Sequence, residues 1–297
     1  MRKARRKLRI GLIGAGSVGT TLAVALFKGG HSIVSVVSRR ASSARRTARR
    51  VHCRNYSVDL LSLSEHHDLI LIATPEDAIK SIVRQLWRLN LRFTGTYIAH
   101  TSGVFSDEIL KPLRARGATV FSLHPIQTFP KNLSVEHHIR SLEGISYGFV
   151  GDRDSLTFAR RLVRILGGTV LRVPKEEKIL YHLACVFASN YSVALLGAVE
   201  ELMRGFSGRA RLSNFKELVH SSISNALSVG SSQALTGPIS RGSVETVRMH
   251  LLELGKKRKD LIPVYRTLGL LALQLASYEK RLPKKRLQQM KRALKFR

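Results

Sequence analysis

The sequence predicts an α/β fold with a mostly parallel sheet, followed by an all-α carboxyl-terminal domain. Short aliphatic or β-branched runs alternate with helical patterns over residues 1–150, as in repeated β-α-β units. After Pro174 the strand patterns stop and only helical patterns follow. We therefore predict two domains, over residues 1–174 and 175–297.

Each predicted element is a run with strand or helix periodicity. The strands are expected at 8–13, 32–37, 69–73, 96–99, 119–123, 146–150 and 169–173. Helices between them are expected at 18–27, 76–89, 106–116 and 155–166. The second domain is expected to hold helices at 176–206, 212–229, 244–254 and 261–278, with a basic tail helix from Lys284.

The chain is strongly basic. Its 297 residues include 50 Lys and Arg against 20 Asp and Glu, a formal net charge of +30. Such an excess fits nucleic-acid binding, or a solvated surface that attracts anionic small molecules. The basic clusters lack interleaved aromatic residues and any known nucleic-acid motif, which favours the solvated surface. A nucleic-acid-associated protein remains an alternative.

The sequence favours a soluble cytoplasmic protein without a membrane partner. No run of about 18 apolar residues is evident, and the basic amino terminus leads into a strand pattern rather than into a signal-peptide core. Cys53 and Cys185 lie far apart in dissimilar contexts, so both are expected to be free thiols.

A glycine-rich turn joins the first predicted strand to the first predicted helix. In this G-x-G-x-x-G pattern the first glycine permits a tight turn, the second lets the backbone approach a pyrophosphate, and the third lets the helix pack closely. The helix amino terminus presents free N–H groups to the phosphates. The sequence therefore predicts a Rossmann-type dinucleotide site at Gly14, Ala15, Gly16, Ser17, Val18 and Gly19.

The end of the second predicted strand indicates which dinucleotide is bound. An NAD site carries an Asp or Glu there to accept the ribose 2′-hydroxyl, whereas this chain has Ser38, Arg39 and Arg40. A serine hydroxyl can hydrogen-bond a 2′-phosphate and an arginine can pair with it bidentately, so we predict NADP as cofactor. Alternatively, the two arginines belong to the general basic excess.

Three further polar turns follow predicted strands at the edge where such sheets bind ligands. We expect the first two to contact the cofactor and the third to contact the substrate. Their residues are Thr74 and Pro75, then His100, Thr101 and Ser102, then His124 and Gln127.

The first predicted helix after Pro174 offers groups for acid-base chemistry. Reduction of a carbonyl by a nicotinamide requires a proton donor and stabilisation of the oxygen. Lys178 and His182 lie four residues apart on one helical face that continues to Ser189, with Asn190 adjacent, so these four are catalytic candidates. Apolar surroundings would lower the pKa of the lysine toward neutrality. Alternatively, Lys178 extends to solvent and His182 is a hydrogen-bonded interior histidine.

The segment 236–242 breaks two predicted helices with a Gly-Pro turn. It presents hydroxyl groups and the guanidinium of Arg241, which suits a substrate carboxylate. Alternatively, it is a plain interhelical turn with a surface arginine.

Taken together, the motifs 14–19, 100–103, 124–129, 181–191 and 234–242 resemble a known family over nearly the whole chain. These are the NADP oxidoreductases that join a Rossmann-like domain to a helical domain of unknown function. More distantly, the chain is similar to the β-hydroxyacid dehydrogenase, ketopantoate reductase and pyrroline-carboxylate reductase group, whose helical domains form homodimers. The resemblance implies a homodimer through the helical domain.

In the β-hydroxyacid dehydrogenases and ketopantoate reductases, a lysine and an asparagine four residues later mark the active site. Lys178 matches that lysine, whereas His182 stands in the place of the asparagine. We therefore expect an NADP-dependent oxidoreductase, without a metal, for a small carboxylate-containing carbonyl or hydroxy compound such as a ketopantoate-like acid. The alternatives are a non-catalytic NADP(H) sensor and the nucleic-acid-associated protein.

Overall fold

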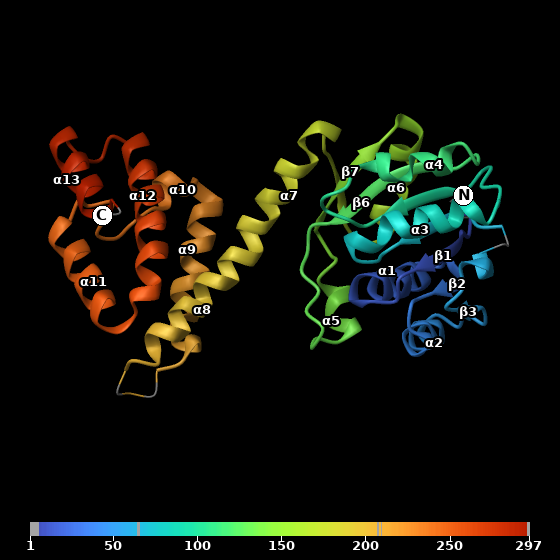
Figure 1. Cartoon of the computed structure of the whole chain (residues 1–297), viewed down its shortest axis with the longest axis horizontal. Coiled ribbons are helices and arrows are strands. Elements are labelled where there is room, and N and C mark those ends of the chain that lie inside the picture. The colour runs from blue at the N-terminus through green and yellow to red at the C-terminus, as the bar shows by residue number, and fades with distance from the viewer. Residues whose placement is uncertain (1–5, 64–65, 207, 209, 296–297) are drawn as a thin grey trace, which may run out of the picture. The chain divides into compact units, whose positions relative to one another are not determined.

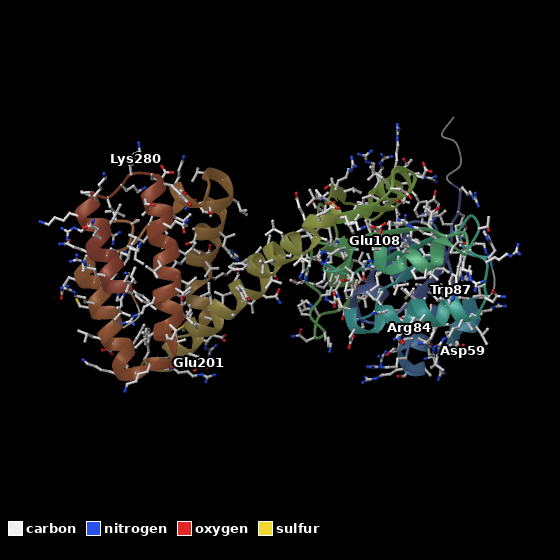
Figure 2. The ribbon with its side chains drawn as sticks, turned by 45° about the horizontal axis from the view of Figure 1, so that its top comes forward. Asp59, Arg84, Trp87, Glu108, Glu201 and Lys280 are labelled. Atoms are coloured by element: carbon white, nitrogen blue, oxygen red, sulfur yellow. The ribbon has the colours of Figure 1, made fainter. Side chains whose placement is uncertain are left out.

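The computed structural model describes residues 6–63, 66–206, 208 and 210–295. It divides into two compact units, Met1–Ser189 and Asn190–Arg297. The first unit holds all the described strands, and the described elements of the second unit are all helical. Figure 2 shows nitrogen-tipped side chains around the outside of each unit, as expected for a chain of net charge +30.

The first unit is built on one eight-stranded sheet of order β3-β2-β1-β4-β5-β6-β7-β8 (Figure 1). Neighbouring strands are parallel except β6 and β7, which are antiparallel. The strands are β1 (Arg9–Ile13), β2 (Ser32–Val37), β3 (Tyr56–Ser57), β4 (Leu69–Ile72), β5 (Tyr97–His100), β6 (Thr119–Pro125), β7 (Ser146–Gly151) and β8 (Thr169–Arg172).

Helices cover both faces of this sheet. One core packs the sheet against α1 (Ser17–Lys28), α2 (Ala41–Arg50), α5 (Val135–Arg140) and α6 (Arg153–Ile165). The other face packs against α3 (Glu76–Arg88), α4 (Lys111–Arg114) and the 3-10 turns Leu60–Leu63 and Asp107–Leu110. Every residue of β4 is buried because layers lie on both of its sides, which is why its sequence is continuously apolar.

The strand order brings the glycine-rich turn after β1 next to the turn after β4. The chain proceeds from β1 outward through β2 to β3 and then returns to place β4 on the other side of β1. Ligands of such sheets bind outside the carboxyl ends of the strands, at this reversal of order. The glycine-rich turn after β1 and the turn after β4 therefore meet at the expected ligand-binding edge.

A helical run leaves the sheet unit after β8. It starts with the 3-10 turn Lys175–Glu177 and continues as α7 (Lys178–Val186), a π-helical turn (Phe187–Tyr191) and α8 (Ser192–Met203). An ion pair of 2.9 Å between Lys175 Nζ and Glu108 Oε1 ties its start to the sheet unit; Glu108 is labelled in Figure 2.

The second unit continues with further helices. They are the 3-10 turn Leu212–Phe215, α9 (Lys216–Val229), α10 (Ser231–Ala234), α11 (Val244–Lys257), the 3-10 turn Lys259–Leu261, α12 (Ile262–Tyr278) and α13 (Lys284–Leu294). Its buried core joins Val247 of α11, Leu273 of α12, and Met290 and Leu294 of α13. The predicted basic tail helix thus packs into the unit through its apolar face.

The predicted fold class is confirmed, with several local differences. The sequence analysis did not predict α2, β3, α5 or α10, and it extended the helix at 106–116 over a segment that contains only a 3-10 turn and the short α4. The structure leaves Cys53 and Cys185 as free thiols, as predicted. The segment Lys175–Met203 is long and apolar enough, by length and composition alone, to span a membrane, which corrects the expectation that no such run exists.

Candidate active site

The glycine-rich turn has the geometry of a phosphate cradle. Gly14 has φ +103°, and a Cβ there would lie 2.5 Å from the Ala73 carbonyl oxygen. A Cβ at Gly19 would lie 1.9 Å from the Gly14 oxygen, whereas one at Gly16 would meet nothing within 4 Å. Packing therefore requires the outer two glycines, while the middle one borders open space at the start of α1, where a pyrophosphate fits.

The other three residues of the turn lie at the start of α1. Ala15 packs against the core under α1, and Ser17 and Val18 form the first turn of that helix. Helix α1 has no acidic residue in its first turn, so the charge at its amino terminus is favourable for a phosphate.

The residues that are predicted to bind the 2′-phosphate of NADP follow the end of β2. Ser38 follows the last residue of the strand, and its backbone N–H donates to the Ser57 carbonyl. Arg39 and Arg40 are exposed, and α2 begins directly after them without an acidic residue in its first turn. The described segment thus presents a hydroxyl, two guanidinium groups and a helix amino terminus, all suited to an anion.

The turn after β4 contains an orphaned hydroxyl. Thr74 Oγ1 is buried and has no hydrogen-bond partner among the described residues. Thr74 also borders the cradle, because its Cγ2 would lie 2.8 Å from a Cβ on Gly14. Pro75 follows as the exposed N-cap residue of α3. An unsatisfied hydroxyl beside the cradle fits a polar group of a bound dinucleotide.

The turn after β5 is held together by its own side chains, which corrects the prediction that all of them face the cofactor. His100 is fully buried, its Nδ1 accepts from the Ser102 N–H at 3.2 Å, and its Nε2 lies 2.9 Å from the Ser106 oxygen. The Ser102 hydroxyl donates to Glu76 and accepts from the N–H groups of Val104 and Phe105. Both side chains therefore shape the turn. Thr101 is half-buried, and its N–H donates to the Ile72 carbonyl.

His124 and Gln127 have different environments near the end of β6. His124 Nδ1 lies 2.7 Å from the Tyr181 hydroxyl on α7. In contrast, the Gln127 amide donates to the Ser141 carbonyl and its oxygen accepts from the Thr128 N–H. A contact between Gln127 and the substrate, as predicted, would require these hydrogen bonds to break. In the structure the Gln127 side chain stabilises its loop.

Lys178, the first residue of α7, lies close to His100 and His124. Its side chain is only 2% exposed, and its Nζ has no hydrogen-bond partner among the described residues. The ammonium lies 4.9 Å from the centroid of the Tyr181 ring, a weak cation-π contact. This position excludes the alternative in which Lys178 extends into solvent. A buried, unpaired ammonium is costly, so a lysine here calls for a functional reason.

Burial controls the protonation of the cluster. Desolvation lowers the pKa of Lys178 to about 8. Desolvation, together with the nearby charge of Lys178, lowers the pKa of His124 to about 3 and that of His100 to about 4. No aspartate or glutamate is among the causes of these three shifts. Near neutral pH the histidines are therefore neutral and Lys178 carries the charge.

Two glycines leave room for the rings of the cluster. A Cβ on Gly103 would lie 2.3 Å from His182 Cδ2 and 3.1 Å from His124 Nε2. A Cβ on Gly148 would lie 2.3 Å from the Tyr181 oxygen. The rings of His124 and His182 are 6.2 Å apart, so the predicted His182 does join the cluster.

The remaining predicted residues lie further along the chain. Ser189 is half-buried in the π-helical turn and is the last residue of the first unit. Asn190 is exposed and begins the second unit. Arg241 is exposed within the second unit, in the turn between α10 and α11. Their predicted roles stay predictions.

Sequence reasoning missed Tyr181, Gly103 and Gly148 as members of this site. Tyr181 lies three residues after Lys178 on a helix, a spacing that brings side chains together and could have identified it. The glycines gave no local signal, because their function depends on the packing of β7 and of the 100–103 turn against α7.

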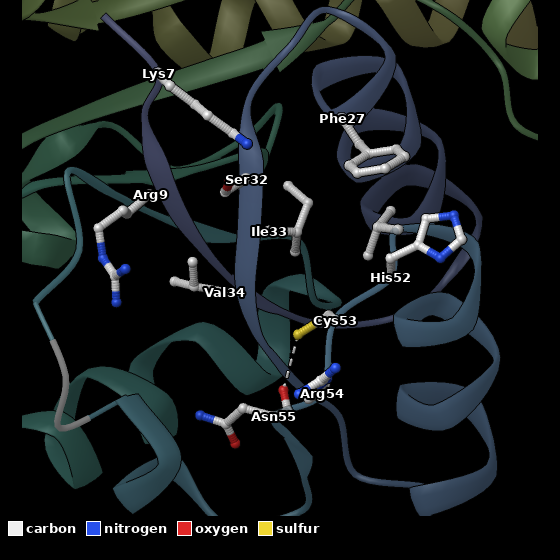
Figure 3. A pocket seen from close by; sticks show the side chains of 11 residues that line it. Lys7, Arg9, Phe27, Ser32, Ile33, Val34, His52, Cys53, Arg54 and Asn55 are labelled. Carbon is white, nitrogen blue, oxygen red and sulfur yellow. Dashed lines mark hydrogen bonds between the residues drawn. The ribbon is translucent and has the colours of Figure 1, made fainter.

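A hollow lies at the opposite, amino-terminal edge of β1 and β2 (Figure 3). Its eleven lining residues include three cations, Lys7, Arg9 and Arg54, and the Phe27 and His52 rings are 5.5 Å apart. Because 50 of the 297 residues are Lys or Arg, three such residues in eleven follow the general composition. The cluster around Lys178 is therefore the candidate active site.

Two domain models match the chain. A Rossmann-like domain model matches residues 1–125, and the model of a domain of unknown function, DUF2520, matches residues 145–272. No curated protein matches the chain.

Three solved structures share the fold. A provisionally named NADP oxidoreductase from Bacteroides fragilis is 23% identical, with TM-score 0.73 over 90% of this chain and 98% of its own. A Thermotoga maritima protein is 23% identical, with TM-score 0.68 over 91% and 99%. A reductive aminase from Aspergillus terreus, in complex with NADPH and ethyl-5-oxohexanoate, is 15% identical, with TM-score 0.57 over 96% and 92%.

At these identities the structural likeness establishes the fold. The two domain models together cover most of the chain and confirm the resemblance found in the sequence. The chain therefore joins a Rossmann-like domain to a DUF2520 domain and shares the fold of the three solved structures named above.

Proposed function

We propose that the protein is an NADP-dependent oxidoreductase that acts on a small carbonyl or hydroxy compound bearing a carboxylate. The observation that carries the proposal is the buried, unpaired Nζ of Lys178, in the same unit and at the same sheet edge as the glycine cradle. Burial of an unpaired ammonium costs stability, so a purely structural role would not explain this lysine. A role in acid-base chemistry at the sheet edge that binds the dinucleotide does explain it.

The residues divide the work between binding and proton transfer. Bound NADP(H) supplies or accepts a hydride. The N–H groups at the start of α1 hold the pyrophosphate, and Ser38 with Arg39 and Arg40 holds the 2′-phosphate. Lys178 holds a proton that neutralises the oxygen as the carbonyl is reduced, and it accepts that proton in the reverse direction.

The charge of the cluster supports a substrate that is reduced at oxygen. Lys178 is its charged group near neutral pH, and no carboxylate contributes to its pKa shifts. A positively charged group at the site stabilises a developing alkoxide and opposes a protonated imine. It also attracts a carboxylate, so we propose 2-oxo acids of the ketopantoate type as first substrates.

Turnover with NADPH tests the proposal. The decrease of NADPH absorbance is followed with a panel of 2-oxo acids and, in parallel, with cyclic imines. The proposal expects steady turnover with at least one oxo acid and loss of that turnover in Lys178→Met. Saturable NADPH binding without turnover on either panel would contradict the enzyme and favour a cofactor sensor.

The helical unit supports a second proposal, that two copies associate through it. Helix α9 alone exposes Leu218, Ile223, Leu227 and Val229, with Leu227 83% exposed. Apolar surface of this extent is rare on a monomer and is typical of an interface between subunits. The apolar run Lys175–Met203 also exposes large hydrophobic side chains, among them Ile179, Leu180 and Val193. We therefore propose a cytoplasmic homodimer, in which that run is an interface element and not a membrane span.

Light scattering tests the association. The wild-type chain is expected to have twice its 33.1 kDa mass in solution. Leu227→Glu is expected to yield monomers, whereas Ser228→Glu, which places the same charge on the side of the helix away from all four apolar residues, should leave the dimer intact. A monomeric wild-type chain at micromolar concentration would contradict the proposal.

A further inference from the structure

Tyr181 has the contacts of a residue that orients a neighbour. Its hydroxyl lies 2.7 Å from His124 Nδ1, and the two rings meet edge to face at 5.8 Å. The phenol oxygen packs closely against Gly148 of β7. Because a Cβ on Gly148 would lie 2.3 Å from that oxygen, a side chain there would displace the phenol.

The 2.7 Å contact between the phenol oxygen and His124 Nδ1 contains one hydrogen, supplied by one of the two groups. A phenol O–H is a stronger donor than the N–H of a neutral imidazole, and a bare imidazole nitrogen is a stronger acceptor than a phenol oxygen. The favoured arrangement therefore has Tyr181 donating to Nδ1. Donation to Nδ1 leaves the ring proton of the neutral imidazole on Nε2.

The Nε2 atom of His124 is the ring nitrogen that does not contact Tyr181. It lies 3.1 Å from the position of a Cβ on Gly103, in the turn after β5. No hydrogen-bond partner for it is found among the described residues, and it is not among their fully buried, unpaired atoms. Unlike His100, whose two nitrogens both bond the backbone, His124 therefore has one nitrogen available to a ligand.

We propose that Tyr181 is a positioning residue that holds His124 in the tautomer with its proton on Nε2, so that His124 donates a hydrogen bond to the substrate oxygen. This inference rests on the proposed function and names the group that selects the substrate. The N–H of His124 and the ammonium of Lys178 both require an acceptor. Together they select a carbonyl or hydroxyl oxygen and reject a protonated imine nitrogen, which has no lone pair to offer.

The tautomer can be observed without cofactor or substrate. Two-bond ¹H–¹⁵N spectra of the histidine rings distinguish a bare Nδ1 from a bare Nε2, and the His124 signals are identified as those absent in His124→Gln. We expect a protonated Nε2 and a bare Nδ1 in the wild type, with loss of this preference in Tyr181→Phe. The opposite tautomer in the wild type would overturn the proposal.

A double-mutant cycle links the tautomer to catalysis. A glutamine amide places an N–H near the position of Nε2 and has no tautomer to be fixed. Tyr181→Phe is therefore expected to lower kcat on the order of tenfold to a hundredfold in the wild type but less than about threefold in the His124→Gln background. The KM for NADPH should not change. Equal losses in both backgrounds would show a merely structural role and overturn the proposal.

Controls separate this failure from others. Tyr56→Phe removes the hydroxyl of an exposed tyrosine on β3 and should change neither the spectra nor kcat. A Tyr181→Phe protein with an unchanged thermal midpoint shows that the fold is intact. If the protein reduces oxo acids but His124 has the opposite tautomer, only this inference is refuted. If no turnover is found with any substrate, the proposed function is refuted, whereas the observed tautomer of His124 remains valid.

Discussion

The ammonium of Lys178 lies 4.9 Å from the centroid of the Tyr181 ring and has no other partner among the described residues. The side chain is 2% exposed, so a charge is held away from water with only a weak compensating contact. The buried charge of Lys178 lowers the free energy of unfolding, and the acid-base role proposed for this residue explains why such a residue is present.

The first prediction is that Lys178→Met stabilises the protein while it abolishes activity. The pKa of Lys178 falls from 10.5 to about 8 on folding. Between these values the unfolded chain binds a proton that the folded chain does not, so stability rises with pH from about 8 to about 10.5, and the penalty is complete below 8. Replacement by an uncharged side chain of similar size should therefore raise the free energy of unfolding at pH 7, by at most about 3 kcal/mol.

Urea unfolding at pH 7 and at pH 10 checks this prediction. The stabilising effect of Lys178→Met should be larger at pH 7 than at pH 10, because the wild-type lysine is neutral in the folded state at the higher pH. A variant that unfolds more easily than the wild type at pH 7 would show that the ammonium has a stabilising partner.

The second prediction concerns the pH dependence of reduction. His100 and His124 stay neutral above about pH 5 because their pKa values are lowered, and burial raises the pKa of Tyr181. His182 and Cys185 are the other titratable groups of the cluster. With Lys178 as the proton donor, kcat/KM for reduction should be level below about pH 8 and fall tenfold per pH unit above it.

Oxidation of the corresponding hydroxy compound should show the opposite trend, rising through the same pH. The profile should persist in His182→Asn and in Cys185→Ser, which remove the other two titratable groups. A reduction profile that rises with pH, or that loses its downward limb in either variant, would assign the proton to another residue.

The third prediction uses two glycines of the same turn as a matched pair. A Cβ at Gly16 meets nothing in the protein within 4 Å, and its φ is −84°. Gly16→Ala should therefore leave the unfolding midpoint unchanged and weaken NADPH binding at least about tenfold, by occupying the space of the pyrophosphate.

In Gly19→Ala the added methyl group would meet the Gly14 oxygen at 1.9 Å. This variant should lose roughly 1–3 kcal/mol of stability. Thermal unfolding and NADPH titration of both variants check the pair. Unimpaired NADPH binding by Gly16→Ala would place the nucleotide elsewhere.

The fourth prediction is that Arg39→Asp changes the preference between cofactors. Loss of a charge-assisted hydrogen bond to the 2′-phosphate should weaken NADPH binding about tenfold to a hundredfold and leave NADH binding nearly unchanged. Arg49→Asp makes the same charge change at an exposed position in the last turn of α2, away from the end of β2. Equal losses for both cofactors, or equal effects of both variants, would refute the assignment of the 2′-phosphate site.

The sequence predicted most of the sheet because its strands are apolar and evenly spaced. It missed α2, whose residues are mainly Arg, Ser and Ala: only Ala44, Thr47 and Ala48 are buried, which is too narrow an apolar face to detect in a basic segment. It missed β3 because two residues have no periodicity. The antiparallel direction of β7 depends on which way the chain returns, and local patterns carry no such information.

The cofactor cradle could be predicted because its function resides in one contiguous motif. The proton-donating cluster could be predicted only in part. Lys178 and His182 follow from helical spacing, but the contact of Tyr181 with His124 joins residues 57 positions apart. His100 and Gln127 were assigned to ligands because their turns face the right edge, yet their polar atoms bond the backbone of their own loops.

Titration of the purified wild-type chain with NADPH and NADH measures the dinucleotide binding on which the proposed chemistry depends. We expect saturable NADPH binding, followed as a change in nicotinamide fluorescence or as heat, with NADH bound about tenfold or more weakly because it lacks the 2′-phosphate. Absence of any signal with either nucleotide would contradict the cradle at Gly14–Gly19 and the chemistry assigned to Lys178 together.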